Sequence, residues 1–424
     1  MTPGPAIPWY KNQEQVLTLL SVGIAGSLVF WPLLTSVLSI LLFVYWAIFL
    51  EKDFNKERLK WILLFTSIYI LAIIGSFYSG NTGEAMFKLQ QQSALALYPL
   101  VFGTAVAFTP AAYNRILTSF AWFTLAGCLF CLGFGLMNLV LTGSAEKLYG
   151  YQMVVLKDMS PFMLGLYCLL SVVYLLSAIY KNAFTYGRQR NINVALILFL
   201  SLFLFVLGNR NVLFSWSLVI IFFYLRRMAK GTFRIISITI LVALFAVAVA
   251  FNPSLRQQVK DLTDFSRSNT IQLDADSSLG RGWGGKALRI AIWQCSIDIM
   301  EQHWLTGVGT GDVQDSLQAA YERRKFYFAS RYNTYNAHNQ FVQETLAYGI
   351  AGFVLFAACL LLPLFWYPAN PGRQLYVLFI LSFFIICLTE SILEISKGIV
   401  FYSLFNSIFA FVRPPLITTQ KKEH

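Results

Sequence analysis

Long apolar runs separated by short polar stretches follow one another along most of the chain. Twelve of these runs approach the ~20 residues that an α-helix needs to cross a bilayer. They cover residues 16–31, 33–50, 60–78, 92–108, 116–141, 161–180, 192–208, 212–225, 235–251, 339–365, 375–389 and 398–412. A chain in lipid has to satisfy its own backbone hydrogen bonds, so we expect each run to form a helix. The pattern predicts an all-α polytopic membrane protein with about twelve transmembrane helices.

The composition supports a membrane protein and excludes an ordinary soluble domain. Of the 424 residues, 57% are hydrophobic and 12% are charged, whereas about a quarter of the residues of a soluble domain are charged. Five of the six cysteines lie in apolar runs, and only Cys295 does not. This arrangement predicts neither a disulfide framework nor a zinc site.

The distribution of Lys and Arg predicts the orientation of the helices. With a cytoplasmic N-terminus, 17 of the 32 cations fall on inner segments and five fall in short outer loops. The five outer cations are Lys88, Lys147, Lys157, Arg210 and Lys397. Short loops rich in Lys and Arg stay in the cytoplasm, and an even number of spans returns the chain to the side on which it began. We therefore expect both termini in the cytoplasm.

One outer segment is long and divides the chain into three parts. We expect spans one to nine over residues 1–251, the outer segment over 252–337, and spans ten to twelve with a tail over 338–424. The outer segment holds ten Lys or Arg and nine Asp or Glu, a balance typical of a folded, solvent-facing and mainly helical piece. Residues 286–302 repeat apolar side chains at helical spacing. They carry too many charges to span, which predicts a helix at the membrane surface.

Three other patterns in the outer segment each have a functional and an ordinary interpretation. Asp274 and Asp276 form a D-x-D pair like the cation site of some sugar transferases, but no third ligand lies beside them. The glycines of GVGTGD (307–312) either approach an anion or form a tight turn, and their spacing favours the turn. Residues 321–339 mix cations such as Arg331 with aromatic rings, typical of a headgroup belt or of a docking site for an anionic lipid or phosphorylated glycan. Nucleic acid is excluded because the segment faces outward.

His338 lies where the chain re-enters the membrane, at the start of a recognisable pattern. A lone histidine at a helix start is either a polar cap or a general base. His338-Asn339, nine residues, Gly349, two residues and Gly352 match the H-[NSQ]-x9-G-x-x-[GTY] pattern of bacterial O-antigen ligases. The chain resembles that family over nearly its whole length, including the number of spans and the large outer segment after span nine.

Further residues carry the same resemblance. Arg289 lies four residues before Trp293 on the outer helix, and Arg210 occupies the short outer joint between spans seven and eight. TESILEISKGIVF (389–401) resembles a glutamate-bearing outer loop of the wider ligase and polymerase superfamily. One feature departs from the family. Relatives often have Ser before the joint arginine and Gly after it, whereas this chain has Asn209 and Asn211.

The resemblance implies a fold, an activity and a set of partners. It implies a GT-C-like glycosyltransferase architecture in the bacterial inner membrane, with the large segment and the active site on the periplasmic side. The implied enzyme transfers O-antigen polysaccharide from undecaprenyl diphosphate to a sugar of lipid A–core and so completes lipopolysaccharide. It is an inverting glycosyltransferase that needs no metal or other cofactor. Its expected partners are the lipid-linked donor, the lipid A–core acceptor and membrane lipids.

The resemblance and the chemistry together assign the candidate residues. The acceptor hydroxyl loses a proton as it attacks, which suits His338 as general base. The leaving diphosphate suits Arg210 and Arg289, whose forks bind phosphate oxygens bidentately. Second-rank candidates are Asn339, Glu344, Glu390, Glu394 and Arg331.

The acidic candidates among these also have ordinary interpretations. Glu390 and Glu394 are expected to share a helix face. They are either part of the site, solvated loop residues or partners of Lys397. Glu344 is unusual inside an apolar span and is expected to bond to Gln340 or to support the site.

Three rival functions remain at this point. One is a polymerase of the same superfamily, which joins repeat units on the lipid carrier, and another is an enzyme that transfers glycans to protein side chains. The histidine pattern favours the ligase over both. A lipid or polysaccharide transporter would place ionisable groups near the middle of the membrane, whereas the candidates here gather at one outer face.

Overall fold

The computed structural model describes residues 12–105, 109–180, 187–227, 285–331, 333–366 and 372–412, together with residues 250 and 256. In this part of the chain the structure is almost entirely helical, without a strand. The longer helices are α1 (Gln13–Phe30), α2 (Pro32–Phe49), α3 (Lys56–Ser76), α6 (Pro110–Thr142), α8 (Pro161–Tyr180), α9 (Arg188–Leu207), α10 (Arg210–Arg227), α14 (Gly285–His303), α17 (Gln340–Trp366), α18 (Arg373–Cys387) and α19 (Ser396–Phe411). The shorter ones are α4 (Thr82–Gln92), α5 (Ala94–Thr104), η2 (Ala145–Leu148), α7 (Gly150–Met153), α15 (Val313–Arg323), α16 (Tyr327–Ser330) and η3 (Ile392–Glu394).

Within the described residues, most of the predicted apolar runs coincide with helices. In this part of the chain seven helices are long and apolar enough to cross a membrane, and two shorter apolar helices cover Arg210–Phe223 and Arg373–Cys387. The predicted span 92–108 corresponds to α5, which is only 11 residues long. The predicted span 235–251 lies outside the described residues except for Ala250. The chain is thus a polytopic, all-α membrane protein.

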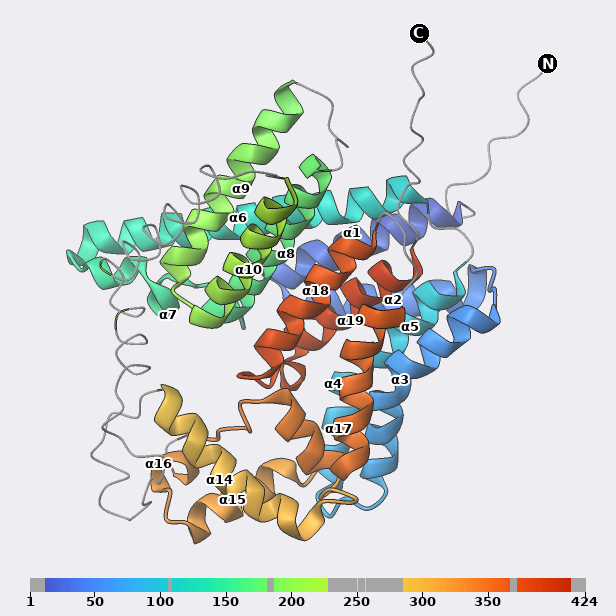
Figure 1. Cartoon of the computed structure of the whole chain (residues 1–424), viewed down its shortest axis with the longest axis vertical. Coiled ribbons are helices and arrows are strands. Elements are labelled where there is room, and N and C mark those ends of the chain that lie inside the picture. The colour runs from blue at the N-terminus through green and yellow to red at the C-terminus, as the bar shows by residue number, and fades with distance from the viewer. Residues whose placement is uncertain are drawn as a thin grey trace.

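The helices form two parts with separate hydrophobic cores (Figure 1). The larger part is a bundle, and the smaller part contains α14, α15 and α16, drawn in gold at the lower left. The smaller core includes Ile292, Cys295 and Ile299 of α14, together with Tyr321 of α15 and Tyr348 of α17. This confirms the predicted apolar face of residues 286–302. The face is covered by protein, however, and not by lipid as a surface helix would require.

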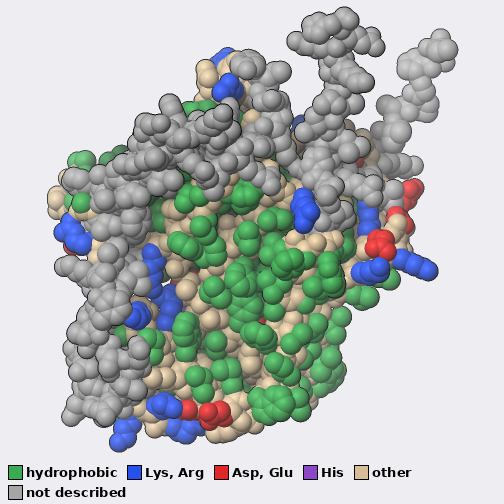
Figure 2. All heavy atoms as spheres, in the orientation of Figure 1, with side chains coloured by type: hydrophobic (Ala, Val, Ile, Leu, Met, Phe, Trp, Pro, Cys, Tyr) green, Lys and Arg blue, Asp and Glu red, His purple; other side chains and the backbone are tan. Residues whose placement is uncertain are grey.

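The outer surface of the bundle carries the side chains expected next to lipid. Figure 2 shows hydrophobic side chains spread over the middle of one face, with charged side chains toward its margins. Large apolar residues are exposed along α2, α3 and α17, among them Leu33, Ile40, Ile48, Leu63 and Val354. A soluble protein rarely exposes so large an apolar area, so this surface fits a bilayer.

Helix α17 is broken at Gly349, the first glycine of the histidine pattern. Gly349 has φ 62° and ψ −149°, a conformation that is essentially restricted to glycine. The loop that follows α14 supplies the hydrogen bonds that the break removes. The Val308 N–H donates to the carbonyl of Leu346 at 2.8 Å, and the Ile350 N–H donates to that of Trp304 at 2.9 Å. The break therefore joins α17 to the smaller part of the molecule.

The glycine-rich turn GVGTGD is the packing partner of this break. Gly307 fits against the backbone of Ala347, where a β-carbon would lie 2.3 Å from the carbonyl oxygen. The Gly309 N–H donates to that same carbonyl at 3.0 Å, and the Gly311 N–H donates to the Ser79 hydroxyl at 3.0 Å. These N–H groups are bonded to protein and do not face an anion. The tight-turn interpretation is confirmed.

Substituting alanine for Gly349 should destabilise the protein strongly. The conformation costs a non-glycine residue about 1–3 kcal/mol, and the new β-carbon would lie 2.3 Å from the Leu305 carbonyl oxygen. We expect the thermal unfolding midpoint of Gly349→Ala in detergent to fall by several degrees. Gly133→Ala is the matched control, because a β-carbon on Gly133 of α6 meets nothing within 4 Å. Equal midpoints for the two variants would contradict this account of the break.

Candidate active site

The Glu390 carboxylate joins two of the predicted site residues. Its Oε1 accepts a hydrogen bond and ion pair from Arg289 Nη2 at 2.6 Å, and its Oε2 lies 3.3 Å from His338 Nδ1. The three side chains come from α14, from the loop between α18 and α19, and from the segment before α17. They are 16%, 23% and 24% exposed for Arg289, Glu390 and His338. The site is thus sheltered and still open to a substrate.

Three acceptors hold the guanidinium of Arg289 in place. Besides Glu390, the Thr389 carbonyl accepts from Nε at 3.0 Å and the Gly285 carbonyl accepts from Nη1 at 3.1 Å. A snorkelling arginine would extend toward water, whereas this one is fixed by a backbone loop. The protein therefore holds the positive charge of Arg289 in one place.

Arg210 reaches the same place from the joint between α9 and α10. A β-carbon placed on Gly285 would lie 3.3 Å from Arg289 Nη1 and 3.5 Å from Arg210 Nη2. Both guanidinium groups therefore lie beside Gly285, although their positions in the sequence are 79 residues apart. Two neighbouring cations of this kind form a site for an anion with more than one charged oxygen.

The unusual asparagines of the joint have identifiable structural roles. Gly208 ends α9 in the left-handed conformation with φ 66°. The Asn209 side chain accepts from the N–H groups of Asn211 and Val212, both at 3.2 Å, and so caps α10. Asn211 donates through Nδ2 to the Thr389 hydroxyl at 2.6 Å. The joint is thereby tied to the loop that carries Glu390, and Arg210 starts a rigid helix.

His338 occupies a strained and well-supported position. Its φ of 45° is rare for a residue other than glycine and costs about 1–2 kcal/mol. Its N–H donates to Asn336 Oδ1 at 3.0 Å, and the preceding Ala337 carbonyl accepts from the Trp293 indole at 3.0 Å. The Tyr335 ring packs on the imidazole with centroids 5.5 Å apart. Backbone strain held in this way is common at functional sites.

The first residues of α17 hold the loop that carries Glu390. Asn339 caps α17 and also donates from Nδ2 to the Leu388 carbonyl at 3.1 Å. Gln340 accepts from the Leu393 N–H at 2.8 Å and donates to Glu344 Oε1 at 2.8 Å. The expected Gln340–Glu344 bond is thus confirmed. Asn339 and Gln340 thus each bond to the backbone of the segment on either side of Glu390.

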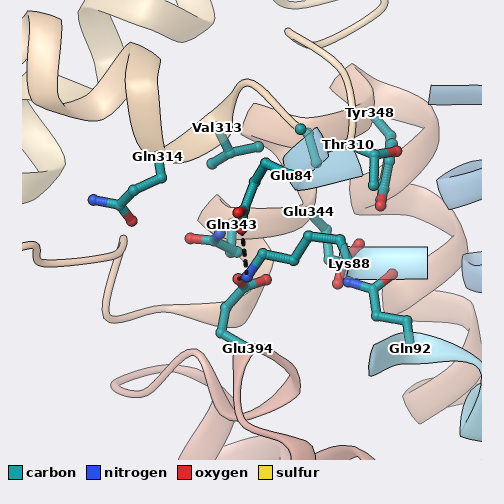
Figure 3. A pocket seen from close by; sticks show the side chains of 12 residues that line it. Glu84, Lys88, Gln92, Thr310, Val313, Gln314, Gln343, Glu344, Tyr348 and Glu394 are labelled. Carbon is teal, nitrogen blue, oxygen red and sulfur yellow. Dashed lines mark hydrogen bonds and ion pairs between the residues drawn. The ribbon is translucent and has the colours of Figure 1, made fainter. Parts of the chain in front are cut away.

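Glu394 differs from its predicted surroundings. It lies in η3 while Glu390 lies outside any helix, so the prediction of a shared helix face was wrong. Its partner is Lys88 of α4, at 2.6 Å. Figure 3 shows Lys88 between Glu84 and Glu394 at a small pocket. The predicted pairing with Lys397 was also wrong, because Lys397 is buried and its ammonium lies 3.5 Å from the Val29 carbonyl.

The remaining sequence candidates lie apart from this cluster. Arg331 packs over the Tyr327 ring at 4.0 Å and lies 3.7 Å from Glu322, with its side chain 58% exposed. Asp274 and Asp276 lie outside the described residues. Over the described part of the chain, His, Cys, Asp and Glu side chains form no group of three suited to a metal ion. The cluster instead offers two guanidiniums, one imidazole and one carboxylate.

The structure places Glu390 and Trp293 in roles that the sequence did not assign. Nothing in the sequence around Glu390 distinguishes it from the other acidic candidates or shows that it bridges Arg289 and His338. In the sequence, Trp293 is only the residue four positions after Arg289. One turn after Arg289 on α14, it holds the backbone next to His338, which gives that spacing a physical reason.

The fold and the site define the class of protein. A multi-helix membrane protein has at one end of its bundle a paired-arginine site beside a carboxylate-bound histidine. Residues 194–357 match the family model described as O-antigen ligase, a region that includes Arg210, Arg289, His338 and the break of α17 at Gly349. Over this region, which is less than half of the chain, the protein is similar to the O-antigen ligase family. A comparison with curated proteins finds no match.

Lys88 and Glu394 provide a test of how the loop is held. Their side chains are 18% and 13% exposed, so Lys88→Met should lower stability by about 2 kcal/mol by leaving a sheltered charge unpaired. Glu394→Gln should lower stability much less in the Lys88→Met variant than in the wild-type chain. Thermal unfolding of the double-mutant cycle measures this coupling. Lys60→Met is the control, since its pair with Glu57 is exposed and should contribute little. Additive effects of the Lys88 and Glu394 substitutions on stability would show that this ion pair does not hold the loop.

Proposed function

We propose that the chain is an O-antigen ligase of the bacterial inner membrane. It transfers O-antigen polysaccharide from undecaprenyl diphosphate to a sugar of lipid A–core at the periplasmic face, with both chain termini in the cytoplasm. The observation that carries the proposal is the convergence of Arg210, Arg289 and His338 from three distant parts of the sequence. The family match over the region that contains all three supports it.

His338 acts as the general base in this proposal. The Glu390 carboxylate lies against Nδ1, which favours the tautomer with its proton on Nδ1 and leaves Nε2 as the acceptor. Nε2 takes the proton of the acceptor hydroxyl while the hydroxyl oxygen bonds to the anomeric carbon. The bond from that carbon to the diphosphate oxygen breaks in the same step. The products are the new glycosidic bond, with inversion, and undecaprenyl diphosphate.

Arg210 and Arg289 stabilise the charge that develops on the leaving diphosphate. A guanidinium has five N–H donors, and the three described bonds of Arg289 use three of them. Two N–H groups therefore remain to meet phosphate oxygens without breaking the ion pair with Glu390. Fixed donors of this kind contribute about 3–4 kcal/mol each to the transition state. The arginines perform the charge stabilisation for which other glycosyltransferases use a metal.

Transfer by the purified protein tests the proposed reaction. A defined lipid-linked oligosaccharide and lipid A–core should yield glycosylated lipid A–core, with and without EDTA. His338→Ala should lower the rate by at least about 100-fold because it removes the base. Normal turnover by that variant would refute the base assignment. Products that remain on the carrier lipid and grow by whole repeats would show a polymerase instead, and loss of activity in EDTA would point to Asp274 and Asp276.

Arg210→Lys tests whether the joint arginine binds the diphosphate with its fork. Lysine keeps the charge, and with it the predicted topology, but it cannot bind two oxygens in one plane. We expect kcat/KM for transfer to fall about 100-fold with unchanged expression and thermal stability. Arg58→Lys is the control. Arg58 lies near the start of α3 and bonds to the Ala105 carbonyl, outside the candidate site. Full activity of Arg210→Lys would leave Arg210 with a structural role only.

A further inference from the structure

A second candidate binding site lies directly beside the arginine pair. It is a pocket of about 310 Å³ between the connection of α6 to α8 and the joint of α9 and α10. Its lining includes Glu146, Tyr149, Tyr151, Gln152, Phe162 and Asn209. We refer to it as the aromatic pocket. Its volume lies within the range of ligand sites, about 300–1,000 Å³.

The joint that carries Arg210 forms part of the wall of the aromatic pocket. Gly208 and Asn209 line the pocket, and the next residue in the chain is Arg210. Tyr151 connects the two sites electrostatically as well. Desolvation raises the Tyr151 pKa, the Glu390 carboxylate raises it further, and Arg289 lowers it, so the Tyr151 phenol lies within electrostatic reach of both residues. A group held in the aromatic pocket would therefore lie next to a diphosphate held by the arginines.

The side chains of the aromatic pocket have the chemistry that a sugar ring requires. A pyranose has apolar C–H faces and a rim of hydroxyl groups. The rings of Tyr149, Tyr151 and Phe162 offer flat apolar surfaces, while Glu146 and Gln152 offer hydrogen-bonding groups for hydroxyls. Tyr151 is 79% exposed, so its ring is available to stack on a ligand. A lipid chain would contact the rings but would offer no hydrogen-bonding partner to the carboxylate and the amide.

We propose that the aromatic pocket binds a pyranose ring of a substrate beside the diphosphate site. The proposal rests on the proposed function and adds to it a sugar subsite built from the α6–α8 connection. The ring has two sources: the sugar of the donor that is bonded to the diphosphate, or the acceptor sugar of lipid A–core. Both sources present a pyranose ring with apolar faces and hydroxyl groups, so they share one recognition chemistry.

Binding measurements that separate the sugar from its lipid test the aromatic pocket. The probes are undecaprenyl diphosphate with and without one N-acetylhexosamine, and lipid A with and without its core sugars. Affinities are measured on the full chain in nanodiscs. Tyr151→Ala should weaken one of the two sugar-bearing lipids about tenfold, the expected size of one lost ring contact. It should leave the sugar-free lipids unchanged, and Tyr151→Phe should retain the affinity.

The controls separate the pocket from the overall function. Phe77→Ala removes another highly exposed ring, at the end of α3 and outside the pocket, and should have no effect. A selective loss for the donor or for the acceptor supports the pocket and identifies the source of the ring. Equal losses for sugar-bearing and sugar-free lipids, or no loss at all, would overturn the sugar subsite alone. If the wild-type chain binds neither undecaprenyl diphosphate lipid, the proposed function itself fails.

Discussion

The carboxylate of Glu390 is the group on which the arrangement of the candidate site depends. Glu390 lies between the Arg289 guanidinium and the His338 imidazole, and its negative charge stabilises the positive charge of the arginine. Its two oxygens have different tasks, because one holds Arg289 at 2.6 Å and the other lies 3.3 Å from His338. The rest of the surrounding structure serves to hold the loop that presents this carboxylate. Bonds from Asn211, Asn339 and Gln340 reach its backbone or neighbouring side chains.

The histidine pattern combines chemistry with packing. His338 is the proposed general base, whereas Gly349 and Gly352 allow close backbone contacts at and after the break in α17. A β-carbon on Gly352 would lie 2.2 Å from the Glu344 carbonyl oxygen, so the chain folds closely back on itself after the break. This geometry brings the first turn of α17, with Asn339 and Gln340, under the loop of Glu390. The residues between the histidine and the glycines therefore form the first, short part of a broken helix.

The apolar pattern predicted most of the fold, and the resemblance predicted the residues that meet. Helix positions follow from local hydrophobicity, which is why α1 to α3 and α17 to α19 agree with the predicted runs. The partners of charged groups do not follow from local sequence. Lys397 was the nearest cation to Glu390 along the chain, yet Glu390 pairs with Arg289, about a hundred residues away. The aromatic pocket could not be predicted from the sequence either, because its walls come from two separate connections.

Because the candidate site is partly exposed, its side chains can be held in place and still be reached from outside. An ion pair buried completely would resist a substrate, because removing its partner costs about 3–5 kcal/mol. A fully exposed pair would contribute little and leave both side chains mobile. At 16–24% exposure, Arg289, Glu390 and His338 lie between these limits. The Arg289 side chain is ordered by neutral acceptors such as the Thr389 carbonyl, so under the proposed function the diphosphate would meet a guanidinium that is already oriented. Such preorganisation lowers the reorganisation needed as charge moves onto the leaving group.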